Sequence, residues 1–142
     1  MSTKLVSKVA AADVEPNRRR GGELRVLLGP ATVGATTGFL GSLELGPHEF
    51  VSEHYHPYSE EFLYVTRGEI VVRIDGEPVV ATAGEAVFVP KKARHRVENR
   101  TDEPAEVVFH LCPLAPRPDM GHVDTESVPE PGLANISVDG AR

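Results

Sequence analysis

The sequence predicts an all-β fold, an antiparallel sandwich or barrel. Thirteen glycines and twelve prolines divide the chain into short segments, with valine-rich runs between them. Valine and other β-branched residues favour strands, whereas glycine and proline mark turns. No stretch of the chain has a convincing helical period. With 142 residues, the chain is long enough for one domain with a single hydrophobic core.

The first strands are expected after a polar N-terminal arm, which we assign to residues 1–22. Residues 24–28 are apolar and stop at a Gly-Pro pair, and residues 36–45 form a second apolar segment that ends at another such pair. Because Gly-Pro pairs mark turns, each segment predicts a strand. A third strand is expected to begin near Phe50 and to carry two histidines.

The later strands follow from short apolar runs between turn residues. Asp75-Gly76 is the best hairpin signal, because an Asp-Gly pair suits a two-residue turn between antiparallel strands. Strands are expected at residues 61–65, 70–74, 79–81, 86–89, 95–99 and 106–112. We therefore place the folded body at residues 23–112.

The chain changes character after Cys112. Residues 113–142 contain five prolines and few large apolar side chains. Because such a segment cannot bury enough apolar surface to form its own core, we expect an extended C-terminal arm that lies on the body.

Composition excludes several classes of function. The formal net charge of −6 disfavours nucleic acid or an anionic membrane as the main partner. No apolar run approaches the length of a membrane span, and the N-terminus lacks the apolar block of a signal peptide. Cys112 is the single cysteine, so no intrachain disulfide can form and a cytoplasmic location is expected.

The segment that follows Phe50 contains candidate metal ligands. His54 and His56 lie two residues apart, a spacing that places both imidazoles on one face of a β-strand. Glu61 follows on the next predicted strand, and two imidazoles with a carboxylate suit several divalent transition metals. A lone His-x-His pair is weak evidence, so the hypothesis needs another histidine on a neighbouring strand. His95 begins a later predicted strand and supplies that candidate.

The same residues resemble the two sequence motifs of the cupin family. The first motif reads G-x5-H-x-H-x3,4-E-x6-G, and the chain matches it with His54, His56, Glu61 and Gly68. The second motif reads G-x5-P-x-G-x2-H-x3-N, and the chain matches it with Gly84, Pro90, His95 and Asn99. Two positions depart from the motifs. Gly46 lies eight residues before His54 rather than six, and Lys92 replaces the third conserved residue of the second motif, a glycine.

This resemblance implies a small jelly roll that binds one divalent metal ion. The implied ligands are His54, His56, Glu61 and His95. Zn²⁺ is the expected ion, and Fe²⁺, Ni²⁺ and Mn²⁺ are also compatible with these ligands. Glu60 competes with Glu61 for the carboxylate position, but Glu61 keeps the six-residue separation from Gly68.

His110 is the predicted catalytic residue. It lies in the last predicted strand, fifteen residues after His95, and in cupins this strand runs beside the strands that carry the metal ligands. An inward-facing histidine there would be a fourth nitrogen ligand in place of Glu61, or an acid/base next to the metal. The alternative is a histidine packed in the core. His48 and His122 lie in turn-like segments, where we expect exposed side chains.

A narrower resemblance concerns function. The arginine-rich N-terminal arm, residues 54–70 and the proline-rich residues 113–126 are similar to polyketide cyclases of the tetracenomycin and resistomycin type. This implies a metal-dependent enzyme of antibiotic biosynthesis that closes rings in a poly-β-ketone by intramolecular aldol condensation. The substrate would be carried by an acyl carrier protein. A metal-dependent dioxygenase or other oxygenase is one alternative, because the same ligands suit O₂ activation. A non-catalytic cupin that binds a small molecule is the other.

Two further expectations concern partners. Arg18, Arg19 and Arg20 form either a solvated arm or a cationic docking site for an acidic partner or a phosphate. A small sandwich with long arms commonly hides a sheet edge by pairing with a second copy. We therefore expect a homodimer in which the N-terminal strands pack across the two-fold axis.

Overall fold

The structure, a computed structural model, describes residues 7–136, which form ten strands and three short helical turns. The strands are β1 (Glu23–Leu28), β2 (Phe39–Leu45), β3 (Phe50–Tyr55), β4 (Glu60–Arg67), β5 (Glu69–Ile74), β6 (Glu77–Thr82), β7 (Ala86–Val89), β8 (His95–Glu98), β9 (Ala105–Cys112) and β10 (Val123–Asp124). The helical turns are η1 (Ala11–Asp13), α1 (Pro30–Val33) and η2 (Pro118–Met120). None of the helices in this part of the chain is long and apolar enough to cross a membrane.

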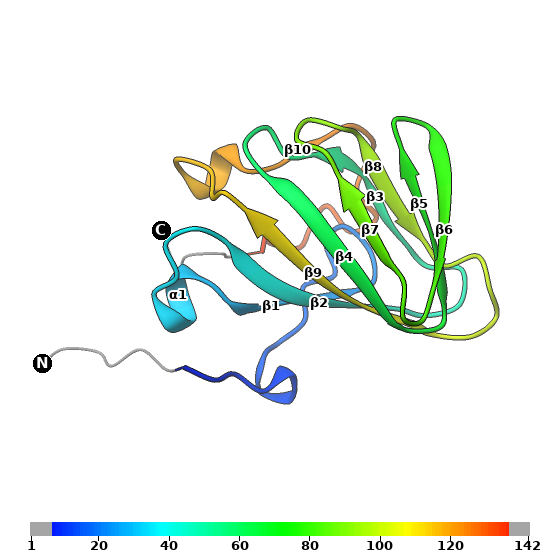
Figure 1. The fold of residues 1–142 in the computed structure, drawn as a ribbon, viewed down its shortest axis with the longest axis horizontal. Coiled ribbons are helices and arrows are strands. Elements are labelled where there is room, and N and C mark those ends of the chain that lie inside the picture. The colour runs from blue at the N-terminus through cyan, green and yellow to red at the C-terminus, as the bar shows by residue number, and fades with distance from the viewer. Residues whose placement is uncertain (1–6, 137–142) are drawn as a thin grey trace, which may run out of the picture.

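The strands form two sheets of five strands each, and the sheets face one another across the core (Figure 1). Sheet A has the order β1-β2-β9-β4-β7, and sheet B has the order β10-β3-β8-β5-β6. All strand pairs are antiparallel. This two-sheet sandwich confirms the predicted all-β jelly roll.

Alternating burial shows which face of sheet A meets the core. In β4 the residues Glu61, Leu63 and Val65 are buried, whereas the residues between them are exposed. In β9 the inward residues include Phe109 and Leu111, which belong to the core cluster with Leu63 and Val65. Full burial of one such side chain contributes roughly 1.5–3 kcal/mol. Because Glu61 lies on the same face of β4 as Leu63 and Val65, its carboxylate enters the same interior as the apolar core.

Two local features show how turn chemistry shapes the chain. Asp75 and Gly76 both have positive φ, 48° and 85°, and they form the two-residue turn between β5 and β6 that the sequence predicts. The helical turn α1 was not predicted, because four residues are too few to show a period. It begins with Pro30 and is followed by Gly34 in a left-handed conformation, an arrangement typical of helix starts and ends.

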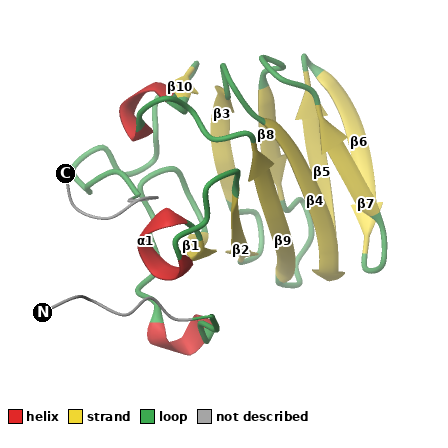
Figure 2. Ribbon diagram, turned by 60° about the vertical axis from the view of Figure 1, so that its left-hand side comes forward, coloured by secondary structure: helices red, strands yellow, loops and turns green. Residues whose placement is uncertain are grey.

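Both arms pack on the body on the same side of the strands, where the three helical turns also lie (Figure 2). The C-terminal arm adds β10 to the edge of sheet B, with Asp124 opposite His54. The N-terminal arm contributes a bridge between Asn17 and Leu24. Residues 1–6 and 137–142 of the predicted arms lie outside the described residues.

Two residues of the arginine cluster, Arg19 and Arg20, hold the two arms together. Arg19 donates from Nη1 to the carbonyl oxygens of Pro131 and Leu133, at 2.6 and 2.5 Å. Arg20 pairs with Asp124 at 3.1 Å, and Arg18 pairs with Glu23 at 3.2 Å. The prediction of a solvated arm is therefore wrong for Arg19 and Arg20, whereas Arg18 is 45% exposed, and docking of an acidic partner stays a prediction. These side chains bind carbonyl and carboxylate oxygens of this same chain.

Packing of the N-terminal strands across a two-fold axis stays a prediction, but sheet A presents an apolar outer surface on β4 and β7 on which we propose that the homodimer forms instead. Phe62, Tyr64 and Phe88 are 45%, 48% and 46% exposed, and the rings of Phe62 and Phe88 lie 5.3 Å apart. Exposed aromatic clusters of this kind commonly mark protein interfaces. We expect wild-type protein to have about twice the 15.3 kDa monomer mass in light scattering, and Phe62→Lys to halve it. Val80→Lys is the matched control, because Val80 is 59% exposed on the other sheet. A monomeric wild type would contradict the dimer.

Candidate metal centre

Four metal-binding side chains converge between the two sheets. His54 ends the inward face of β3, His56 follows that strand, Glu61 lies in β4 and His95 begins β8. One ligand atom from each residue lies within 4.8 Å of the others, and all four residues are buried. His54 pairs with His95 across β3 and β8, which places the two imidazole rings 4.3 Å apart. The structure thus brings together the four ligand candidates named from the sequence.

Backbone carbonyls fix the orientation of the three imidazoles. The Nδ1–H groups of His54, His56 and His95 donate to the carbonyl oxygens of Ser52, Gly121 and Ala93, at 2.7, 2.9 and 3.0 Å. A neutral imidazole that donates from Nδ1 keeps its lone pair on Nε2. This is the arrangement seen when histidines bind metals, since the outer hydrogen bond selects the tautomer and orients the ring.

Glu61 brings a negative charge into this cluster. Its Oε1 lies 2.8 Å from Nε2 of His95 and 3.4 Å from Nε2 of His56. Burial opposes ionisation of Glu61, but hydrogen bonding to the two histidines outweighs it and holds the pKa of the carboxyl well below its usual range. Burial also lowers the pKa of His95, but the hydrogen bond to Glu61 overcomes this and raises it. A carboxylate and a bare Nε2 at this distance repel unless a proton or a metal cation lies between them.

These donors fit a divalent ion. Three imidazole nitrogens and one carboxylate oxygen form a ligand set that Zn²⁺ and several other divalent transition metals accept. The site could hold such an ion through His54, His56, His95 and Glu61. Glu60, the competing carboxylate, is exposed on the outer face of β4.

The unusual lysine of the second motif supports this site through its backbone. Lys92 has a φ of 70°, in the left-handed region where the motif places glycine. Its N–H donates to the carbonyl oxygen of His56 at 3.0 Å, and this bond ties the β7–β8 loop to the ligand segment. The turn therefore keeps the conformation of the motif despite the side chain.

His110 points away from this centre, so its predicted role as catalytic residue or fourth ligand is wrong. Burial alternates along β9, with Phe109 and Leu111 inside and His110 between them on the outer face. His110 pairs with Phe62 of β4, and their rings lie 6.1 Å apart. Because neighbouring residues of a strand point to opposite faces, His110 cannot reach the interior.

His122, and not His110, is the additional histidine that lies beside the metal-ligand candidates. It was expected to be exposed, but its ring stacks on His54 with centroids 4.3 Å apart and planes 15° apart. Its Nε2–H donates to Oδ1 of Asp124 at 2.7 Å. Burial lowers the pKa of His122 to about 2, and nearby Arg20 adds to this shift. His48, in contrast, is exposed, as expected, and contacts Asp102 at the surface.

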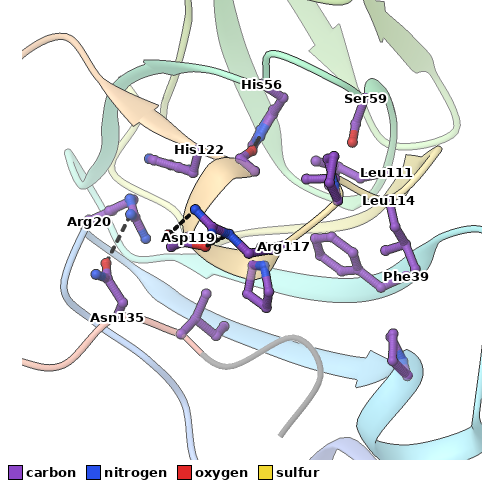
Figure 3. Close-up of a pocket in the computed structure, with 16 residues that line it drawn as sticks. Arg20, Phe39, His56, Ser59, Leu111, Leu114, Arg117, Asp119, His122 and Asn135 are labelled. Atoms are coloured by element: carbon purple, nitrogen blue, oxygen red, sulfur yellow. Dashed lines mark hydrogen bonds and ion pairs between the residues drawn. The ribbon is translucent and has the colours of Figure 1, made fainter. Parts of the chain in front are cut away.

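A cavity of about 330 Å³ opens beside His56 and His122 (Figure 3). Its walls are mainly apolar, from Phe39 and Leu111 of the sandwich and Leu114 and Ile136 of the C-terminal arm. A smaller cavity of about 70 Å³ lies deeper and is lined by all four ligand residues. Both cavities share the residues Arg20, Phe39, His56, Leu111, His122 and Ile136. The C-terminal arm therefore forms part of the site rather than a peripheral tail.

The buried histidines predict a pH-dependent stability for metal-free protein. The pKa of His54 is well below its usual range, because of burial first and neighbouring histidines second, and the pKa of His122 is also lowered. An unfolded chain binds protons at both residues near pH 6.5, whereas the folded chain does not, so stability falls as pH falls. His95 has the opposite shift, and its stabilising effect is already complete below pH 6.5.

We therefore expect metal-free protein to lose about 2 kcal/mol of unfolding free energy between pH 6 and pH 5. Urea unfolding with a chelator present measures this. His122→Asn should lose about half as much over the same interval, because one of the two titrating groups is gone. If the unfolding free energy of wild type and variant changed equally between pH 6 and pH 5, the fold would not hold His122 neutral.

Comparisons with known proteins agree with this structure. A family model described as "Cupin domain" matches residues 41–111. The tetracenomycin polyketide synthase protein TcmJ of Streptomyces glaucescens is 54% identical over 134 residues, 94% of this chain and 90% of that protein. Polyketide synthase CurC of Streptomyces cyaneus is 55% identical over 119 residues, 84% of this chain and 77% of that protein. The solved structure of the polyketide cyclase RemF from Streptomyces resistomycificus has a TM-score of 0.66 at 20% identity, over 89% of this chain and 90% of that chain.

Proposed function

The chain belongs to the cupin family, and from this premise we propose that it is a metal-dependent polyketide cyclase. The proposed reaction is intramolecular aldol closure of a poly-β-ketone in aromatic polyketide biosynthesis. One observation carries the proposal. Four candidate metal ligands line the deeper cavity, and His122, which is hydrogen-bonded to Asp124, lines both cavities. The relatives named as polyketide synthase proteins support the substrate class.

The residues of the site match the requirements of ring closure. When bound, a divalent ion supplies a Lewis acid that makes the methylene between two carbonyls more acidic and favours its enolate. His54, His56, His95 and Glu61 would hold this ion. The apolar walls around Phe39, Leu111 and Leu114 would confine a flexible polyketone and exclude water from it.

His122 is the proposed proton acceptor. Because its Nε2–H is bonded to Asp124, the free acceptor is Nδ1, and the ring is held by this bond and by stacking on His54. A neutral imidazole can take a proton from the acidified methylene. Burial, which lowers its pKa, keeps the free ring neutral but also weakens it as a base, so the role depends on the Asp124 carboxylate, which stabilises the imidazolium as the proton is taken up.

The proposed reaction needs no oxidant. His122 removes one proton from the methylene, and the resulting carbanion forms a C–C bond with a distant carbonyl carbon of the same chain. The C=O π bond opens to an alkoxide, which takes a proton back, and loss of water then leads toward an aromatic ring. The substrate is proposed to arrive as a thioester on an acyl carrier protein.

Product mass tests the proposal against its alternatives. Protein loaded with Zn²⁺ would be incubated with a synthetic poly-β-ketone thioester, with O₂ uptake recorded in parallel. Ring closure conserves the mass or removes water, whereas an oxygenase adds oxygen and consumes O₂. We expect cyclised product without O₂ uptake. After chelation and dialysis of the protein, we expect no cyclised product. The same product mixture with and without protein would favour a non-catalytic binding role.

A further inference from the structure

Arg20 marks the polar end of an otherwise apolar cavity. It lines both the large cavity and the deeper one, and its side chain is only 12% exposed. Figure 3 shows it between His122 and Asn135, on the side of the cavity away from Phe39 and Leu114. A buried arginine next to proposed ligands for a metal cation is costly unless it has a function or a full set of partners.

The partners of Arg20 leave part of its guanidinium group free. Nε donates to Oδ1 of Asp124 at 3.1 Å, and Nη2 donates to Oδ1 of Asn135 at 3.0 Å. A guanidinium carries five N–H groups, so these two bonds leave three without a hydrogen-bond partner among residues 7–136. The two bonds also fix the plane of the group, because they hold it from two sides.

Charge in this part of the cavity favours an anion. Asp124 accepts a hydrogen bond only from Nε of Arg20, and Asn135, which accepts from Nη2, is neutral, so the remaining N–H groups donate to no carboxylate among residues 7–136. The pKa of Arg20 is lowered by burial, which shows how poorly the cation is solvated. Because the site is shielded from water, a hydrogen bond to an anionic oxygen is stronger here than at the surface.

We propose that Arg20 is the anion subsite of the cavity and binds the enolate oxygen of an acidic β-dicarbonyl compound. This inference rests on the proposed function, because it assigns to Arg20 the oxygen on which charge develops when His122 removes the proton. The planar guanidinium can donate two parallel N–H bonds to the two oxygens of a β-dicarbonyl, which a lysine cannot do. Arg20 acts by positioning and charge, and it exchanges no proton.

The neighbouring arginine provides a matched control. Arg19 also binds the C-terminal arm, through the carbonyl oxygens of Pro131 and Leu133, but it does not line either cavity. Loss of arm anchoring should therefore affect Arg19→Gln and Arg20→Gln alike. Loss of the anion subsite should affect Arg20→Gln alone.

The probe is pentane-2,4-dione, a small β-diketone whose enolate has its own ultraviolet absorption. We would measure its dissociation constant and the pH at which the bound dione ionises, in metal-free and in Zn²⁺-loaded protein. Wild type should ionise the bound dione at lower pH than in solution. Arg20→Gln should weaken enolate binding roughly 10- to 100-fold, the usual effect of losing a hydrogen bond to a charged group. The affinity of Arg20→Lys for the enolate should lie between those of wild type and Arg20→Gln. The affinity of Arg19→Gln should stay within about threefold of wild type.

Two results would overturn the subsite. One is enolate binding by Arg20→Gln that equals wild type. The other is an equal loss in Arg19→Gln, which would reduce Arg20 to an anchor for the arm. These outcomes are distinct from failure of the cyclase proposal. Absence of ring closure by wild-type protein would reject the reaction, even if dione binding depends on Arg20.

Discussion

Replacing His95 by alanine is expected to remove the bound divalent ion and to lower the rate of ring closure by at least about a thousandfold. His95 is the most buried of the four ligand candidates, at 1% exposure, and its Nε2 faces Glu61. Without it, two imidazoles and one carboxylate remain, and Glu61 loses the imidazole that lies 2.8 Å from its Oε1, so the remaining ligands are no longer held in place and we expect the ion to be lost on purification. A Lewis acid supplies several kcal/mol of transition-state stabilisation, and about 4 kcal/mol corresponds to a thousandfold in rate.

The matched control for this substitution is His48→Ala. His48 is 63% exposed and contacts Asp102 at the surface, so its loss should change neither metal content nor rate. Metal content is measured by elemental analysis of protein purified without a histidine tag, and folding by circular dichroism. One ion per chain in folded His95→Ala protein would reject the assignment of the ligands.

The ligand set could be predicted from the sequence because its spacing depends on local strand geometry. His54 lies at the end of β3, His56 directly after it on the same side of the chain, and Glu61 at the start of the next strand. The two-residue repeat of a strand determines on which face each side chain lies, without knowledge of the rest of the fold. His95 could be identified as a ligand only through the second motif, because the pairing of β8 with β3 is a long-range contact.

His110 was misassigned because it interrupts a run of apolar residues, Val107 to Leu111, and because the family resemblance places this strand beside the metal ligands. Phe109 and Leu111 face the core, whereas Val108 and His110 lie on an outer face that also carries Phe62. Alternation between apolar and polar residues identifies the inner face only when the outer face is polar. In β9 the contrast is only partial, because Val108 and Cys112 accompany Glu106 and His110 on the outer face, and a shift of one residue reverses the side on which a histidine lies.

The arms could not be placed from the sequence for a different reason. His122 lies in a proline-rich segment, and Arg20 lies in a run of arginines, with no period that indicates burial. Both reach the cavity through contacts between segments about a hundred residues apart, such as Arg20 with Asp124. Only the tertiary structure shows that the two arms meet beside the metal ligands. A signal was nevertheless present, since a histidine two residues from an aspartate is a potential hydrogen-bonded pair.

Replacing His122 by glutamine is expected to lower the rate of ring closure about a hundredfold or more while leaving the metal bound. General acid–base catalysis by a positioned side chain contributes roughly 10²–10⁴-fold. Glutamine can still donate a hydrogen bond to Asp124, but it cannot accept a proton at neutral pH. Because His122 lies outside the set of four mutually close donors, its loss should not empty the metal site.

Asp124→Asn tests the same pair from the other side. The aspartate orients the imidazole of His122 through Nε2 and stabilises the imidazolium that forms when the ring takes a proton. An asparagine at this position would keep the size of the side chain but lose its charge, so we expect a slower reaction with metal content unchanged. Steady-state kinetics and metal analysis on the same preparations separate the two effects. If His122→Gln turned over at the wild-type rate with metal bound, the proton would have to leave the substrate by another route, and the assignment of His122 as the base would be rejected.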